Sequence, residues 1–122
     1  MWLGILVGLA AAEAAQPAVS RTDLQRHDLS TPGWEAIQVR VGFTPGAVAP
    51  WHKHPGEEII YVLTGSLEYQ LDGKSPVTLN AGDVLFVPYG MAHSAKNVGS
   101  GAASELATYV VEKGKPLVVP VR

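Results

Sequence analysis

The amino-acid sequence predicts an all-β protein, built as a single β-sandwich or β-barrel. Glycine and proline turns divide the chain into short runs at intervals of roughly eight to twelve residues, the spacing typical of this fold class. Within the runs, apolar and polar residues alternate with a period of two, as in half-buried strands. No stretch after residue 15 has the pattern of an amphipathic helix. We therefore expect about eight or nine short strands.

The composition indicates one small globular domain. The chain has 122 residues, of which 47% are hydrophobic and 16% charged. Its net charge is -2, and it has no cluster of lysine and arginine, so we expect no nucleic-acid partner. The chain contains no cysteine, which excludes disulfides and thiolate nucleophiles. Nitrogen and oxygen atoms must therefore hold any bound metal ion.

Residues 1–15 have the features of a secretory signal peptide. An apolar run of about eleven residues is followed by small residues that fit cleavage after Ala12-Glu13-Ala14. Because a membrane-spanning helix needs about 20 apolar residues, we expect no membrane span in the mature chain and a periplasmic or secreted location. No lysine or arginine precedes the apolar run. A leader without targeting value, and hence a cytoplasmic protein, is the alternative.

Residues 16–33 are predicted to be a loose N-terminal lead-in segment. They are polar and include prolines and a glycine, so we expect at most one short strand, over residues 24–29. His27 lies in this segment. Its polar surroundings indicate an exposed histidine rather than a metal ligand.

The predicted domain, residues 34–122, begins with an alternating strand. Its apolar positions are Ile37, Val39, Val41 and Phe43. After a turn at residues 44–46, the next strand carries His52 and His54, which are two positions apart and therefore share a face.

The rest of the domain continues the pattern of short runs and turns. The further predicted strands are residues 58–63, 66–71, 77–79, 84–87, a run starting at His93, and residues 105–111. The pair Asp72-Gly73 is favoured in tight hairpin turns. A tail flanked by prolines, residues 116–120, follows the last strand.

Four side chains carry the predicted chemistry, and we expect them to meet at one point: His52, His54, Glu58 and His93. Glu58 is an even number of positions beyond His54, so it keeps the phase if the break at residues 55–56 is short, whereas Glu57 should face water. His93, far along the chain, suits a ligand supplied across a closed sheet. Imidazoles with one carboxylate suit Fe(II), Mn, Ni, Cu or Zn and leave open coordination positions for substrate or oxygen.

These residues fall on two motifs that resemble those of the cupin superfamily. The first is G-x5-H-x-H-x3-E-x6-G over residues 46–65, and the second is G-x5-P-x-G-x2-H-x3-N over residues 82–97. Every anchor position is filled, and the short segment between the motifs is similar to that of small single-domain bacterial cupins of the cupin 2 type, such as quercetinase-like proteins. The resemblance covers roughly residues 34–111.

The resemblance implies a single jelly-roll β-barrel that encloses a metal ion. The implied metal ligands are His52, His54, Glu58 and His93, and Fe(II) is the ion we expect first. Glu58 is the candidate catalytic residue, since it would tune the charge of the ion and could take a proton. The resemblance also implies a homodimer, to whose interface the apolar residues Trp51, Ile59 and Leu63 could contribute.

Three residues are predicted to line a substrate pocket: Gln38, Tyr69 and Tyr109. Arg40 and Tyr61 are weaker candidates. Tyr69 falls in the apolar phase of its strand, where its hydroxyl would need a partner. Asn97 is expected to form hydrogen bonds at a turn or strand end. We find no second carboxylate clearly in phase with Glu58.

The site resembles that of a metal-dependent oxygenase acting on a small organic molecule, which is our first hypothesis. A non-catalytic cupin that binds or senses a small ligand or a metal ion is the second. Metal-dependent lyase or isomerase chemistry is the third, because it would use the same site. A cupin fold does not decide among these reactions.

Overall fold

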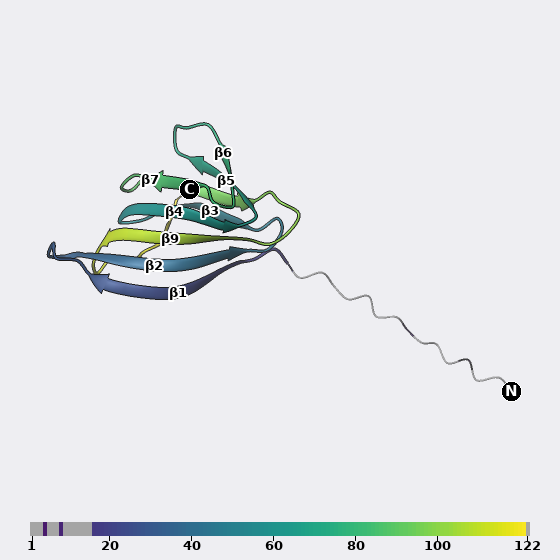
Figure 1. The fold of residues 1–122 in the computed structure, drawn as a ribbon, viewed down its shortest axis with the longest axis horizontal. Coiled ribbons are helices and arrows are strands. Elements are labelled where there is room, and N and C mark those ends of the chain that lie inside the picture. Colours follow the sequence, from purple (N-terminus) through teal and green to yellow (C-terminus); the bar gives the residue numbers. More distant parts are fainter. Residues whose placement is uncertain (1–3, 5–7, 9–15, 122) are drawn as a thin grey trace.

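Two five-stranded antiparallel sheets pack against each other across the hydrophobic core (Figure 1). The computed structural model describes residues 4, 8 and 16–121, so most of the predicted signal peptide, residues 1–15, lies outside the described residues. Within the described part the fold is a jelly-roll of β-strands, as predicted. That part contains no helix of the length and apolar character needed to cross a membrane.

The strands of each sheet are as follows. The first sheet has the order β1 (Val19–Asp28), β2 (Trp34–Phe43), β9 (Ala103–Glu112), β4 (Gly56–Thr64) and β7 (Val84–Val87). The second has the order β10 (Val119–Pro120), β3 (Val48–Lys53), β8 (His93–Asn97), β5 (Ser66–Leu71) and β6 (Val77–Asn80). Strands far apart in the sequence are neighbours, such as β2 with β9 and β3 with β8.

The core lies between the inner faces of the two sheets. In β5, and in β2 from Ile37 onward, every second residue is apolar and points into the core, as predicted. The buried residues are Ile37, Val39, Val41 and Phe43 of β2 and Leu67, Tyr69 and Leu71 of β5. Burial of such side chains is the main source of folding free energy, at roughly 25 cal/mol per Å² of apolar surface.

The turn at Asp72-Gly73 forms as predicted, although the hairpin is not tight. The Lys74 N–H donates to the Leu71 carbonyl at 3.0 Å, and Gly73 has a positive φ of 72°. The connection nevertheless extends to Val77, where β6 begins. Pro76 precedes this strand and has no N–H to offer to the ladder, which accounts for the longer loop.

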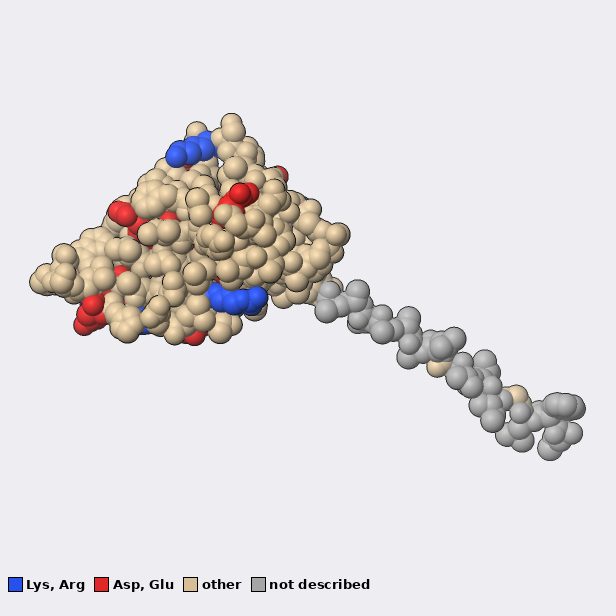
Figure 2. Space-filling view, in the orientation of Figure 1, with Lys and Arg blue, Asp and Glu red and all other residues tan. Residues whose placement is uncertain are grey.

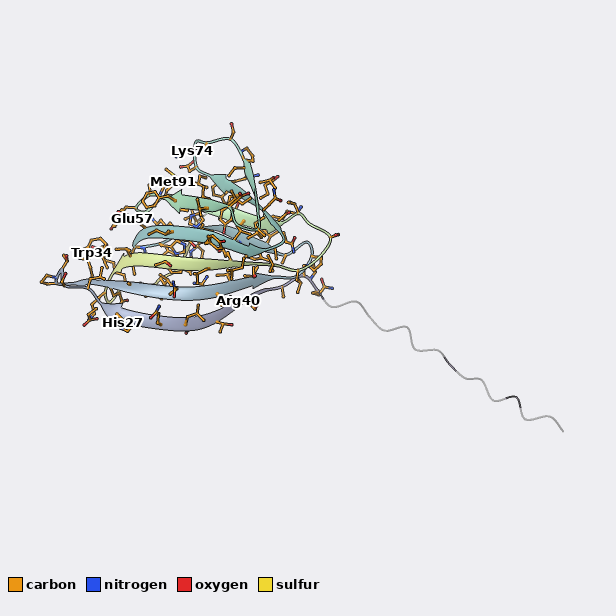
Figure 3. The ribbon with its side chains drawn as sticks, viewed as in Figure 1. His27, Trp34, Arg40, Glu57, Lys74 and Met91 are labelled. Atoms are coloured by element: carbon orange, nitrogen blue, oxygen red, sulfur yellow. The ribbon has the colours of Figure 1, made fainter. Side chains whose placement is uncertain are left out.

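The prediction of a loose lead-in segment at residues 16–33 is wrong. Residues 19–28 form β1, a ten-residue strand that pairs with β2 along its length and has one register shift between Asp23 and Gln25. Almost all of its side chains are exposed, so the strand has no apolar alternation to reveal it. Hydrogen bonding to the open edge of β2 forms it instead. His27 is exposed on this edge strand, as predicted (Figure 3).

The proline-flanked tail also differs from the prediction. Its end forms the short strand β10, which pairs with β3 beside His52 and thereby extends the second sheet. Leu117 of the same tail packs against the core. The tail therefore helps to build the region around the histidines.

Asn97 closes the turn after β8 through three hydrogen bonds, as its predicted role requires. Its amide donates to the carbonyls of Phe43 (3.1 Å) and Gly101 (2.9 Å), and its side-chain oxygen accepts from the Gly99 N–H (3.0 Å). The Asn97→Ala variant should lose about 2 kcal/mol or more of unfolding free energy, because buried polar groups would be left without partners. Urea denaturation measures this loss.

Asn80→Ala is the matched control for this prediction. Asn80 is exposed at the end of β6, so its replacement should cost less than about 1 kcal/mol. Equal losses for the two variants would show that the bonds of Asn97 contribute nothing beyond those of a surface asparagine.

Charged side chains are scattered over the face shown in Figure 2, with uncharged surface between them. That face therefore presents no continuous basic stripe of the kind that follows a nucleic-acid backbone.

Candidate metal centre

Three histidine side chains converge at one end of the space between the sheets. His52 lies on β3, His54 directly follows that strand, and His93 begins β8. Their candidate ligand nitrogens all lie within 4.8 Å of one another. The prediction that His93 comes from across a closed sheet is wrong, because β8 is the neighbour of β3 and His93 pairs directly with His52.

Glu58 reaches the histidines from β4 in the opposite sheet. Its Oε1 lies 3.1 Å from Nε2 of His93 and 3.3 Å from Nε2 of His54. Glu58 is buried, whereas Glu57 is exposed on the outer face, so the predicted phase of both residues is confirmed (Figure 3).

Backbone carbonyls fix the orientation of all three imidazoles. The Nδ1 atoms lie near carbonyl oxygens at 2.6 Å for His52, 2.7 Å for His54 and 2.9 Å for His93. A carbonyl can only accept, so each Nδ1 carries the hydrogen and each Nε2 of a neutral ring presents a lone pair. This is the arrangement by which proteins orient metal-ligating histidines.

The three Nε2 atoms and the Glu58 carboxylate oxygen that face one another are all hydrogen-bond acceptors when the rings are neutral. Nε2 of His54 is buried and has no hydrogen-bond partner in the described part of the chain. Burial raises the pKa of Glu58, whereas hydrogen bonds donated by His54 and His93 when these rings are protonated, which a metal ion would replace, lower it to about 2. Burial lowers the pKa of His52 to about 4, so this ring is neutral at pH 7. Lone pairs and a carboxylate in contact need a cation between them, and a divalent metal ion fits this donor set.

A cavity of about 280 Å³ opens beside the histidines. Tyr69 and Tyr109 both line it, together with His52, Glu58 and His93. Its other walls are mainly apolar and include Val41, Phe43, Val48, Trp51 and Val118. At this volume the cavity is near the lower end of the range for small-molecule sites.

Gln38 does not belong to this cavity, so its prediction as a pocket residue is wrong. It lies on the outer face of β2, where its side chain bonds to Gln25 and Thr108. Arg40, two positions further on, is exposed on the same face (Figure 3). Tyr61 is also exposed, on the outer face of β4.

A second carboxyl group lines the cavity, and the sequence analysis missed it. Glu105 of β9 is buried and accepts a hydrogen bond from the hydroxyl of Tyr69. Burial raises the pKa of Glu105 well above its ordinary value, and the Glu58 carboxylate adds to this effect. The sequence did contain a signal for this residue. Glu105, Ala107 and Tyr109 are alternate positions of β9, so their side chains point to the same buried face.

Glu105 should make the stability of the protein depend on pH. Since its folded-state pKa lies above the unfolded value near 4.5, it opposes folding increasingly as pH rises from about 4.5 toward the folded pKa. The Glu105→Gln variant lacks this titration. Its stability relative to the unmodified protein should therefore rise by up to about 1.4 kcal/mol per pH unit in this range.

Denaturation of both proteins at intervals between pH 4 and pH 9 measures this difference. A constant offset between the two curves would contradict the assignment, because a purely steric effect of the substitution does not vary with pH. Gln70→Glu is the control, because it adds a carboxyl at a half-buried position of β5 outside the core and should produce no comparable slope.

A family model described as a cupin domain matches residues 39–111, more than half of the chain. The chain belongs to the cupin family. The match extends from β2 to β9 and includes all three histidines and Glu58. The resemblance inferred from the two sequence motifs is thus confirmed.

Two curated relatives have different named activities. The cupin is 39% identical over 63 residues to the dimethylsulfoniopropionate lyase DddQ of Ruegeria pomeroyi, a match that covers 51% of this chain and 31% of the lyase. It is 38% identical over 73 residues to an oxalate-binding protein of Thermotoga maritima, covering 59% of this chain and 60% of that protein. The chain thus spans less than two thirds of the length of either relative.

Among solved structures, the cupin superimposes on an oxalate oxidase in complex with the substrate analogue glycolate. The TM-score is 0.68 at 27% sequence identity, and the match covers 84% of this chain and 55% of the oxidase. The named proteins thus include a lyase, a binding protein and an oxidase on related barrels.

Proposed function

We propose that this cupin is a metal-dependent enzyme, an oxygenase, that acts on a small organic molecule. The observation that carries the proposal is the set of three imidazoles whose Nδ1 atoms are held by backbone carbonyls, which leaves three Nε2 atoms directed at one point. That point borders a cavity large enough for a small molecule. A site with protein ligands on one side and open space on the other is suited to catalysis.

In this proposal His52, His54, His93 and Glu58 hold the ion. A bound divalent metal supplies Lewis-acid and redox chemistry. Glu58 offsets part of the positive charge, and its carboxylate can accept a proton when a ligand is displaced. The apolar walls keep bulk water from the reacting molecule. Fe(II) is the ion we propose first, although Mn, Ni, Cu or Zn accept the same ligands.

The experiment that tests this proposal combines metal analysis with oxygen consumption. Untagged full-length protein is analysed by elemental mass spectrometry and then reloaded with each metal under controlled conditions. Oxygen uptake is followed with a panel of small organic acids and phenols. Uptake that requires both metal and substrate supports an oxygenase, and a protein that turns over a substrate equally well without metal would refute it.

A lyase or isomerase is a second candidate, and the Tyr69–Glu105 pair favours it. A hydroxyl and a protonated carboxyl that line the cavity can exchange protons with a bound substrate. Similarity to a dimethylsulfoniopropionate lyase supports the same alternative. Product formation without oxygen uptake would select this candidate.

Similarity to an oxalate-binding protein supports a third candidate, a cupin that binds or senses a ligand without converting it. A compound that raises the melting temperature and is recovered unchanged after long incubation would favour this function.

Periplasmic or secreted location remains a prediction. Fractionation of cells that express the full chain tests it.

The homodimer implied by the family also remains a prediction. Ile59 and Leu63 lie on the outer face of β4, where Val84 and Phe86 of β7 are also exposed. Trp51 instead lies on the second sheet and lines the cavity, so the three predicted interface residues do not share one face. Sedimentation velocity at micromolar concentration measures the oligomeric state.

A further inference from the structure

The cavity has a second polar end that the proposed metal site does not use. Four side chains form it: Arg21 of β1, Tyr69 of β5, and Glu105 and Tyr109 of β9. We call them the distal group. They belong to three strands from both sheets, so their meeting depends on the packed barrel.

Sheet register sets the distance between the distal group and the histidines. Glu58 pairs with Tyr109, and Val62 pairs with Glu105, four positions further along both strands. Four residues of a strand extend about 13 Å. The backbone positions of Glu105 and Glu58 are therefore separated along the strands, and Tyr109, whose ring centre lies 4.7 Å from that of His54, extends between them.

Arg21 lies beside Glu105 on the inner side of the first sheet. It pairs with Val41, which pairs in turn with Glu105, so the three residues form one row across β1, β2 and β9. The Arg21 Nη2 donates to the Tyr109 hydroxyl at 3.1 Å, and the guanidinium lies 5.6 Å from the centre of that ring. Among the described residues, Arg21 forms no ion pair with any carboxylate.

Hydrogen bonding leaves one oxygen of Glu105 available to a ligand. The Tyr69 hydroxyl donates to Oε2 of Glu105, and among the described residues no hydrogen bond forms at Oε1. Burial favours the neutral form of this carboxyl and raises its pKa, although the charge of Arg21 acts in the opposite direction. A neutral carboxyl whose Oε2 already accepts from Tyr69 can donate through Oε1 to an oxygen atom in the cavity.

The charges that face the cavity favour an anion. At the distal group Arg21 is a cation, and burial favours the neutral form of Glu105 beside it, so this end of the cavity carries a net positive charge. Arg21 is exposed to solvent on β1 and also lines the cavity, so its charge lies where a ligand enters from water. The apolar walls in turn favour a hydrocarbon body.

We propose that the cavity binds a small organic carboxylate, with its charged group at the distal group, where Arg21 pairs with it and Glu105 donates a hydrogen bond to it. The body of the ligand lies along the apolar walls, toward the three histidines. The orientation toward the histidines rests on the proposed metal function, whereas the anion site uses only residues of this chain. Arg21 and Glu105 thus select the substrate class.

Calorimetric titration of the full-length protein with butyrate, butyramide and butylamine tests the proposal. These three probes have similar size and differ in charge. Butyrate should bind about tenfold or more tightly than butyramide, since a charge-assisted hydrogen bond is roughly twice as strong as a neutral one. Butylamine should not bind measurably. Equal binding of butyrate and butyramide would overturn the proposal.

Arg21→Gln should lower the affinity for butyrate about tenfold and leave that for butyramide unchanged. Arg40→Gln is the matched control, because Arg40 is exposed on the outer face of β2 (Figure 3). Equal effects of the two variants on butyrate binding would overturn the proposal, since they would reflect net charge alone.

Glu105→Gln keeps an uncharged hydrogen-bond donor and should retain butyrate binding, whereas Glu105→Leu should lose most of it. Thermal unfolding of each variant shows whether the fold persists. If Glu105→Leu does not fold, the Arg21 and Glu105→Gln variants still decide the outcome. Failure of Glu105→Gln to bind butyrate would overturn the role of the neutral donor.

Titrations of metal-free and metal-loaded protein separate this inference from the proposed function. If the protein binds metal but does not prefer butyrate to butyramide, the carboxylate site is overturned and the proposed metal function is not. The protein could instead bind no metal and still prefer butyrate, with the preference lost in Arg21→Gln. That result would overturn the metal-dependent function and support the carboxylate site.

Discussion

The His93→Ala variant is expected to retain less than about one tenth of the metal bound by the unmodified protein. His93 is buried, and its candidate ligand nitrogen lies within 4.8 Å of those of His52 and His54. Loss of groups that only support metal ligands typically costs 10–100-fold in affinity, so loss of a ligand should cost at least about 100-fold. Elemental mass spectrometry after dialysis measures the metal content.

Thermal unfolding provides an independent measure of the same effect. A metal ion that binds only the folded state raises the melting temperature, so added metal should stabilise the unmodified protein and should not stabilise His93→Ala. His27→Ala is the control, because His27 is exposed on β1 (Figure 3). Full metal content in His93→Ala would exclude this histidine as a ligand.

The Gly56→Ala variant should be among the least stable single variants of the protein, with a loss of about 3 kcal/mol or more of unfolding free energy. Gly56 is buried at the start of β4, directly opposite Val111 of β9. A Cβ atom there would collide with the carbonyl oxygen of Val110 and lie 2.7 Å from Cα of Val111. Backbone atoms cannot turn aside as side chains do, so the two strands must separate.

Calorimetry should show this loss as a fall of about 10 °C or more in melting temperature. Gly101→Ala is the control, because no atom lies within 4 Å of a Cβ built at Gly101 and its φ is not in the positive region. That variant should change stability by less than about 1 kcal/mol. A Gly56→Ala protein as stable as Gly101→Ala would contradict the strand spacing described for β4 and β9.

Alternation along single strands was the most reliable guide from sequence to structure. It correctly placed Tyr69 in the core, Glu58 inward and Glu57 outward. The same alternation already placed Gln38 between Ile37 and Val39, on the opposite face, and the prediction of Gln38 as a pocket residue went against it. The pattern succeeds because the direction of a side chain in a strand depends only on its position along that strand.

Features that depend on pairs of distant strands could not be read in this way. The exposed strand β1 forms because β2 has an open edge, and none of its own residues indicates this. The place of β8 beside β3 likewise follows from the order of strands in the sheet. Strand order is set by packing of the whole core, which no local pattern contains.

By itself, then, the sequence determined the all-β class, the cupin family and the four residues of the candidate metal centre, because each depends on local periodicity or on fixed spacing within a motif. Only the tertiary structure decided that Tyr69 meets Glu105 and that Arg21 reaches Tyr109. These contacts join strands far apart in the chain, and the burial that favours the neutral form of Glu105 exists only once both sheets have packed.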